Sequence, residues 1–112
     1  EILYQKSVLY NNFILDFIIK GSEYNYIADT KYKEIYNNDN GYEKDDIKQL
    51  SGYGRVESIV KEFTNDIENY VPKCLIIYPS DDSNNKSIDF EKKEQISGLV
   101  KFYKLGIYLP RL

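Results

Sequence analysis

Short runs of hydrophobic residues, separated by polar turns, fill the first third of the chain. These runs predict β-strands at residues 2–10, 13–20 and 24–32. Polar residues at 11–12 and 20–23 predict the two turns between them. Because a short turn returns the chain beside itself, we expect the strands at 13–20 and 24–32 to pair as a hairpin.

A polar loop and a helix follow the three strands. Residues 33–46 are rich in Asn, Asp and Gly, which predicts an exposed, mobile loop. Apolar positions then recur at close to helical spacing from Ile47 to Phe63 and predict a helix. Asp45 or Asp46 is suited to be its N-cap, because a short carboxylate can accept hydrogen bonds from the first backbone N–H groups.

Two further strands complete the predicted fold. The nearly continuous apolar run at 73–78 predicts a strand covered on both faces, and residues 95–103, extended through 106–108, predict the last strand. The order is therefore three strands, a helix, a strand and a strand. This order predicts an α/β fold, a mixed β-sheet flanked by a helix, in a single domain spanning residues 1–112.

Composition narrows the possible functions. The net charge is −3 and the isoelectric point is near 5.0, which argues against a general polyanion-binding surface. The chain has no histidine, so histidine-based acid–base catalysis within it is excluded. The single Cys74 excludes an internal disulfide and a multi-cysteine metal site, and its apolar surroundings predict a buried, inert thiol.

Cellular location and completeness can also be predicted from composition. One unpaired cysteine fits a reducing compartment, so a cytoplasmic location is expected. No apolar stretch approaches the length of a membrane span, so no membrane association is expected. The chain contains no methionine, which suggests that it is a piece of a longer protein.

Two of the predicted strands carry an aspartate where a charge is costly. Asp16 interrupts the apolar run 13–19, and Asp29 follows Tyr26-Ile27-Ala28 and precedes Lys31 by two residues. The hairpin would bring Asp16 near Asp29, and strand alternation puts Lys31 on the same face as Asp29. Two neighbouring carboxylates repel unless a cation such as Mg²⁺ lies between them. The arrangement therefore suits metal-assisted phosphodiester hydrolysis, although a solvated ion pair is the simpler alternative.

The predicted helix adds a polar pair. Gln49 and Tyr53 are four residues apart and so share one helix face, while Leu50 points elsewhere. This pair can reach toward the sheet and its carboxylates. The alternative is a polar edge with a packed tyrosine.

In combination and order, these features resemble the PD-(D/E)XK nuclease superfamily. A strand Asp, a turn, a strand Asp-x-Lys and a helical Gln-x-x-x-Tyr are typical of its RecB-like branch. Residues 15–19, 27–33 and 46–54 are most similar to the McrC nuclease subunits of McrBC-type modification-dependent restriction systems. The run at 75–79 also fits the strand expected after that helix.

The resemblance implies a restriction-endonuclease-like fold and a metal-dependent endodeoxyribonuclease that hydrolyses phosphodiester bonds in DNA. The carboxylates of Asp16 and Asp29, with the backbone carbonyl of Thr30, would hold Mg²⁺ or Mn²⁺. Lys31 would position the attacking water or stabilise the transition-state charge. The glutamine and tyrosine of the helix would complete the site or contact the DNA backbone. The implied catalytic set is Asp16, Asp29, Lys31, Gln49 and Tyr53.

A partner protein is also implied. McrC-like nucleases work with an McrB-like AAA+ GTPase that recognises modified DNA and translocates it. The present chain has no G-x-x-x-x-G-K-[ST] loop, so it is not expected to hydrolyse a nucleotide itself. Three alternatives remain: another restriction or repair nuclease of the same superfamily, a catalytically inactive interaction module of the same fold, and an unrelated α/β domain with fortuitous acids.

Overall fold

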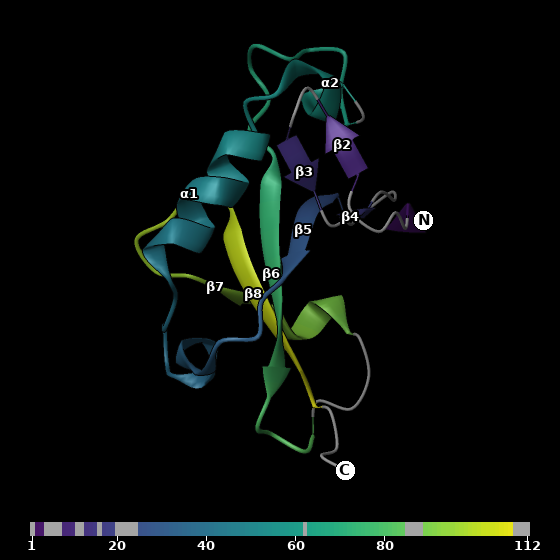
Figure 1. The fold of residues 1–112 in the computed structure, drawn as a ribbon. Coiled ribbons are helices and arrows are strands. Elements are labelled where there is room, and N and C mark those ends of the chain that lie inside the picture. Colours follow the sequence, from purple (N-terminus) through teal and green to yellow (C-terminus); the bar gives the residue numbers. More distant parts are fainter. Residues whose placement is uncertain are drawn as a thin grey trace.

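A mixed β-sheet with helices packed against it forms the α/β fold predicted from the sequence (Figure 1). The computed structural model describes residues 2–3, 8–10, 13–15, 17–19, 25–61, 63–84 and 89–108. Its strands are β1 (Ile2–Leu3), β2 (Val8–Tyr10), β3 (Phe13–Leu15), β4 (Phe17–Ile19), β5 (Tyr26–Thr30), β6 (Lys73–Ser80), β7 (Glu94–Gln95) and β8 (Phe102–Tyr108). Its helices are α1 (Lys44–Tyr53) and α2 (Glu57–Val60), with 3₁₀ turns η1 (Glu34–Asn37) and η2 (Phe90–Lys92).

The main sheet has six strands in the order β1-β4-β5-β6-β8-β7. Its centre is parallel, because β6 pairs in the parallel sense with both β5 and β8. The flanking strands β1, β4 and β7 are antiparallel to their neighbours. Parallel neighbours need a long crossover connection, and the crossover from β5 to β6 carries η1, α1 and α2.

The first two predicted strands are wrong as continuous elements. Strand β1 joins the main sheet by pairing with β4, whereas β2 and β3 pair with each other in a separate two-stranded sheet. The predicted runs 2–10 and 13–20 are thus each divided between two sheets. The hydrophobic pattern shows that a segment can be a strand, but it does not reveal which partner supplies the hydrogen bonds. The predicted hairpin partner is confirmed for β4, since Phe17 pairs with Ala28 of β5.

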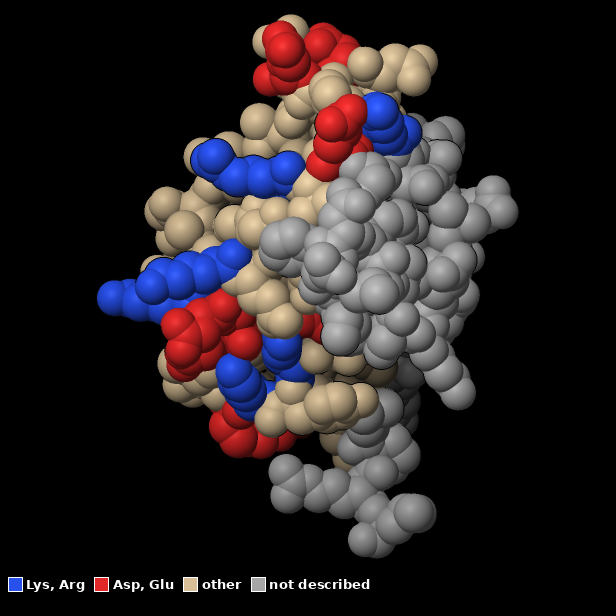
Figure 2. All heavy atoms as spheres, turned by 45° about the horizontal axis from the view of Figure 1, so that its top comes forward, with Lys and Arg blue, Asp and Glu red and all other residues tan. Residues whose placement is uncertain are grey.

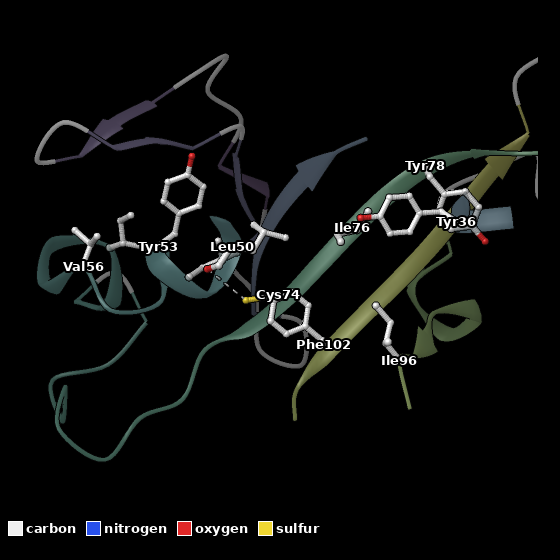
Figure 3. Close-up of a cluster of buried hydrophobic side chains, with 11 residues drawn as sticks. Tyr36, Leu50, Tyr53, Val56, Cys74, Ile76, Tyr78, Ile96 and Phe102 are labelled. Atoms are coloured by element: carbon white, nitrogen blue, oxygen red, sulfur yellow. Dashed lines mark hydrogen bonds between the residues drawn. The ribbon is translucent and has the colours of Figure 1, made fainter. Parts of the chain in front are cut away.

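Hydrophobic side chains cover both faces of the central strands, as predicted for β6. On one face, Cys74, Ile76 and Tyr78 pack with residues of α1 and the segment after it (Figure 3). On the other face, Leu75 and Ile77 belong to a second buried cluster, against which Phe90 of η2 packs. Helix α1 and η2 accordingly lie on opposite sides of the sheet (Figure 1).

The predicted helix from Ile47 to Phe63 is two helices. Helix α1 ends at Tyr53, and α2 begins at Glu57 after a short break. The predicted N-cap is also wrong, because Glu43 caps α1 by accepting a hydrogen bond from the Asp45 backbone N–H at 3.5 Å. The helix therefore starts before its apolar periodicity begins, since its first turn consists of polar residues. None of the helices among the described residues is long and apolar enough to cross a membrane.

The last predicted strand, residues 95–103, is wrong as one continuous element, because residues 96–101 lie outside both strands. Strand β7 ends at Gln95 and β8 begins at Phe102, and these two strands are antiparallel neighbours. The chain reverses between them through Gly98, whose φ of +87° is a conformation that glycine adopts without steric cost. The predicted extension through 106–108 lies within β8.

Candidate active site

The candidate site lies at the carboxyl end of β5. Asp29 is 6% exposed and pairs with Ile76 of β6, and Thr30 ends the strand opposite Ile77. The backbone N–H of Lys31 donates to the carbonyl of Ile77 at 2.9 Å, which carries the sheet pairing one residue beyond the strand. In open α/β sheets, ligands commonly bind at the carboxyl ends of parallel strands. The buried carboxylate of Asp29 is therefore held at a favourable position for chemistry.

The ammonium of Lys31 joins this strand end to helix α1. Its Nζ lies 2.9 Å from Asp29 Oδ2 and donates to Gln49 Oε1, also at 2.9 Å. It lies 3.8 Å from Asp46 Oδ1. One half-buried lysine thus connects residues that are up to 20 positions apart in the sequence, which confirms that Lys31 and Asp29 share a face.

Gln49 and Tyr53 meet as their spacing predicts. Gln49 Nε2 donates to Tyr53 Oη at 3.2 Å, so the two side chains lie along one face of α1. Tyr53 is 4% exposed and its ring belongs to the hydrophobic cluster, with its hydroxyl directed away from Leu50 (Figure 3). Both interpretations of this pair therefore hold in part: Tyr53 is a packed tyrosine, and Gln49 reaches the strand end through Lys31.

The described part of the predicted metal site consists of Asp29 and Thr30. Asp16 lies outside the described residues; the next residue, Phe17, pairs with Ala28, which precedes Asp29. Within the described ranges, no group of three or more Asp, Glu or Cys side chains could hold a metal ion. A carboxylate and a backbone carbonyl are nevertheless the oxygen donors that Mg²⁺ accepts, and Mg²⁺ commonly uses only one or two carboxylates plus water. These two residues fit such an ion as partial ligands.

Asp46 is the site residue that sequence reasoning missed. It is 4% exposed, accepts a hydrogen bond from Tyr36 Oη at 2.6 Å on Oδ2, and accepts another from Lys33 Nζ at 2.9 Å on Oδ1. Burial acts to raise the pKa of the Asp46 carboxyl, but the bonds from Tyr36 and Lys33 and the charge of Lys31 outweigh it and hold the pKa below its ordinary value. Its position three residues before Gln49, on the same helix face, was the available signal.

The loop that carries Tyr36 and Lys33 is held in place by a lysine of the main sheet. Tyr36 is fully buried, whereas residues 33–35 and 38–40 of the same loop are exposed as predicted. Burial and the hydrogen bond to Asp46 raise the pKa of its phenol, so that the hydroxyl stays a donor. Lys104 of β8 is 1% exposed and donates to the carbonyls of Tyr36, Asn38 and Gly41 at 2.9, 2.9 and 3.0 Å. A buried lysine of the sheet therefore supplies three hydrogen bonds to the backbone of this loop.

The surface charge around the helices is mixed. On the face shown in Figure 2, basic and acidic side chains alternate, and neither sign forms a continuous patch. The described side chains of this face therefore form no continuous basic patch.

Comparison of the chain with protein-family models, with curated proteins and with solved structures found no match.

Proposed function

We propose that this chain is the nuclease domain of a metal-dependent DNA endonuclease of the PD-(D/E)XK type, in the RecB-like branch. One observation carries the proposal. Asp29, Lys31, Gln49 and Tyr53, which were singled out from their order and spacing, form one continuous series of contacts at 2.9, 2.9 and 3.2 Å. Of these contacts, the 2.9 Å bond from Lys31 to Gln49 joins the strand end to the helix and does not follow from the geometry of one strand or one helix. An unrelated domain with fortuitous acids would have no particular reason to form it.

The chemistry follows from the positions of these groups. Asp29 and the Thr30 carbonyl, together with Asp16, would hold Mg²⁺ or Mn²⁺. A cation bound there would supply positive charge against the negative charge that develops on the scissile phosphate. Lys31 lies beside Asp29 and can orient a water molecule or stabilise that same charge, and Gln49 fixes the direction of the lysine. This arrangement favours phosphodiester hydrolysis.

We further propose that the chain is a McrC-like cleavage subunit that works with an McrB-like AAA+ GTPase. The net charge of −3 and the alternating charges of the visible face provide little long-range attraction for DNA. DNA capture by a separate translocating subunit removes that difficulty. The nuclease would then need only short-range contacts near Lys31.

Calorimetric titration of Mn²⁺ into the wild-type chain and into two variants tests the metal site. Asp29→Asn removes the buried carboxylate, and Asp45→Asn is the matched control, because it makes the same charge change at an exposed position of α1. We expect Mn²⁺ binding to be lost in Asp29→Asn and retained in Asp45→Asn. Equal Mn²⁺ affinity in all three proteins would contradict the site.

A cleavage assay tests the reaction itself. We expect the wild-type chain to cut modified plasmid DNA in Mn²⁺ or Mg²⁺ when the AAA+ partner is present, and EDTA or Asp29→Asn to abolish cutting. Failure of the wild type to bind Mn²⁺ and to cleave DNA under these conditions would favour the catalytically inactive interaction module instead.

A further inference from the structure

We propose that Asp46 is a positioning residue that holds the ammonium of Lys31 between strand β5 and helix α1. This inference rests on the proposed function only in giving Lys31 a role in the reaction. The placement of Lys31 by Asp46 is a separate claim, which the contacts below support.

Asp46 completes an alternating series of charges. The order in space is Asp29, Lys31, Asp46 and Lys33, with N···O distances of 2.9, 3.8 and 2.9 Å. Among the described residues, the two carboxylates and two ammonium groups of this series balance, with Lys33 the most exposed of the four. Both carboxylates are less than 10% exposed as side chains, where an unbalanced charge is costly.

The role of Asp46 follows from what the cluster would become without it. Lys33 and Lys31 are two residues apart, and of these two lysines Lys31 is the one paired with Asp29. Asp46 binds Lys33 at 2.9 Å and so keeps the second ammonium on the helix side. Within this described series, loss of the Asp46 charge would leave two ammonium groups against the carboxylate of Asp29. Lys31 would then be repelled by Lys33 instead of being held in line with Gln49.

Asp46 is itself fixed from two directions. It stands on α1, in the first turn of the helix, and its other oxygen accepts the 2.6 Å bond from Tyr36. Tyr36 is stacked on Tyr78 of β6, with ring centroids 5.9 Å apart, and its backbone carbonyl accepts from Lys104. The carboxylate therefore has little freedom to follow a displaced lysine. This rigidity is what a positioning residue needs.

The ammonium signals of ¹⁵N-labelled lysine report on this arrangement directly. An ammonium held by carboxylate and amide oxygens exchanges its protons slowly enough to be seen by NMR at mildly acidic pH and low temperature. Lys31→Arg and Lys33→Arg assign the two signals. In Asp46→Asn, which keeps the size of the side chain, we expect both signals to shift or disappear. In the control Asp45→Asn we expect both to remain, and circular dichroism shows whether each variant is folded.

An unchanged Lys31 signal in folded Asp46→Asn would overturn the proposal. Tyr36→Phe provides a second perturbation if Asp46→Asn does not fold. It keeps the buried ring but removes the 2.6 Å bond to Asp46 and the 3.4 Å bond that the hydroxyl accepts from the Glu43 backbone N–H. Tyr36→Phe should shift the Lys33 and Lys31 signals in the same direction as Asp46→Asn does, but by a smaller amount. Unchanged signals in Tyr36→Phe would also overturn the proposal.

Cleavage kinetics separate this inference from the proposed function. Misplacing a catalytic group by about 1 Å can lower a rate by roughly 100-fold, so we expect Asp46→Asn to lower kcat by up to that factor while KM changes little. If the wild type does not cleave DNA, the proposed function fails, yet the ammonium signals still decide whether Asp46 positions Lys31.

Discussion

Replacing Lys104 by methionine tests how the loop that carries Tyr36 and Lys33 is held in place. The ammonium of Lys104 donates to three backbone carbonyls of the loop, at 2.9 to 3.0 Å, and lies 5.8 Å from the centre of the Tyr78 ring. Methionine fills a similar volume but cannot donate. The change therefore removes all three hydrogen bonds without opening a large cavity.

The expected loss can be worked out from these contacts. A hydrogen bond to a charged group contributes roughly 1.5–3 kcal/mol, so three such bonds set a high upper limit on the stability that Lys104→Met can lose. Two effects make the expected loss of stability smaller than this limit. Burial lowers the pKa of Lys104, which shows that the folded protein bears a cost for keeping this ammonium charged, although Glu94 and Asp39 partly oppose that shift. The carbonyl of exposed Asn38 can also regain water. We therefore expect a net loss of about 3 kcal/mol, near the value for breaking a buried charged pair.

Urea unfolding followed by far-UV circular dichroism measures the change. A loss of about 3 kcal/mol should lower the midpoint by on the order of 2 M for a domain of this size. Lys101→Met is the matched control, because Lys101 makes one exposed bond at 3.3 Å to the Val71 carbonyl, and we expect it to cost less than about 1 kcal/mol. If Lys104→Met were as stable as Lys101→Met, the claim that Lys104 anchors the loop would be refuted.

Three further predictions concern stability and reactivity. Gly52→Ala should raise the free energy of unfolding by about 0.5–1 kcal/mol, because nothing lies within 4 Å of the added Cβ. Gly106→Ala should lower the free energy of unfolding by about 1–3 kcal/mol, because its Cβ would meet Tyr78 Cζ at 3.0 Å. Thermal or urea unfolding that gave the opposite sign for either variant would contradict the prediction. The folded pKa of Asp46 is depressed, so its stabilisation is present above the ordinary value of 3.8 and is lost as the pH falls through the folded value. The stability difference between wild type and Asp46→Asn should therefore shrink below about pH 3.8, and a difference that grows there would contradict this. Burial raises the pKa of the Cys74 thiol to about 12, so a thiol reagent should react at pH 8 only after unfolding, and rapid reaction of the folded chain would contradict its burial.

Local patterns were sufficient for part of the site. Alternation along a strand predicted that Asp29 and Lys31 share a face, and helical spacing predicted that Gln49 and Tyr53 do. Both are confirmed by contacts of 2.9 and 3.2 Å. These relations depend only on the geometry of one strand or one helix, which is the same in every protein. Asp46 obeys the same rule with Gln49, but its role is ambiguous in sequence, because an aspartate near a helix start is also one of two candidate N-caps.

By itself, the sequence determined the α/β class, the doubly covered strand β6 and the side chains that each element presents together. These properties come from periodicity and burial preference, which act over a few residues. Only the tertiary structure decided that the first strands are split between two sheets, that Lys104 anchors a loop more than 60 residues away in the chain, and that Asp46 faces two lysines. Each of these depends on which distant segment supplies the partner for a hydrogen bond or a charge. Those partners are determined by the packing of the whole chain, so they cannot be predicted from any short stretch of residues.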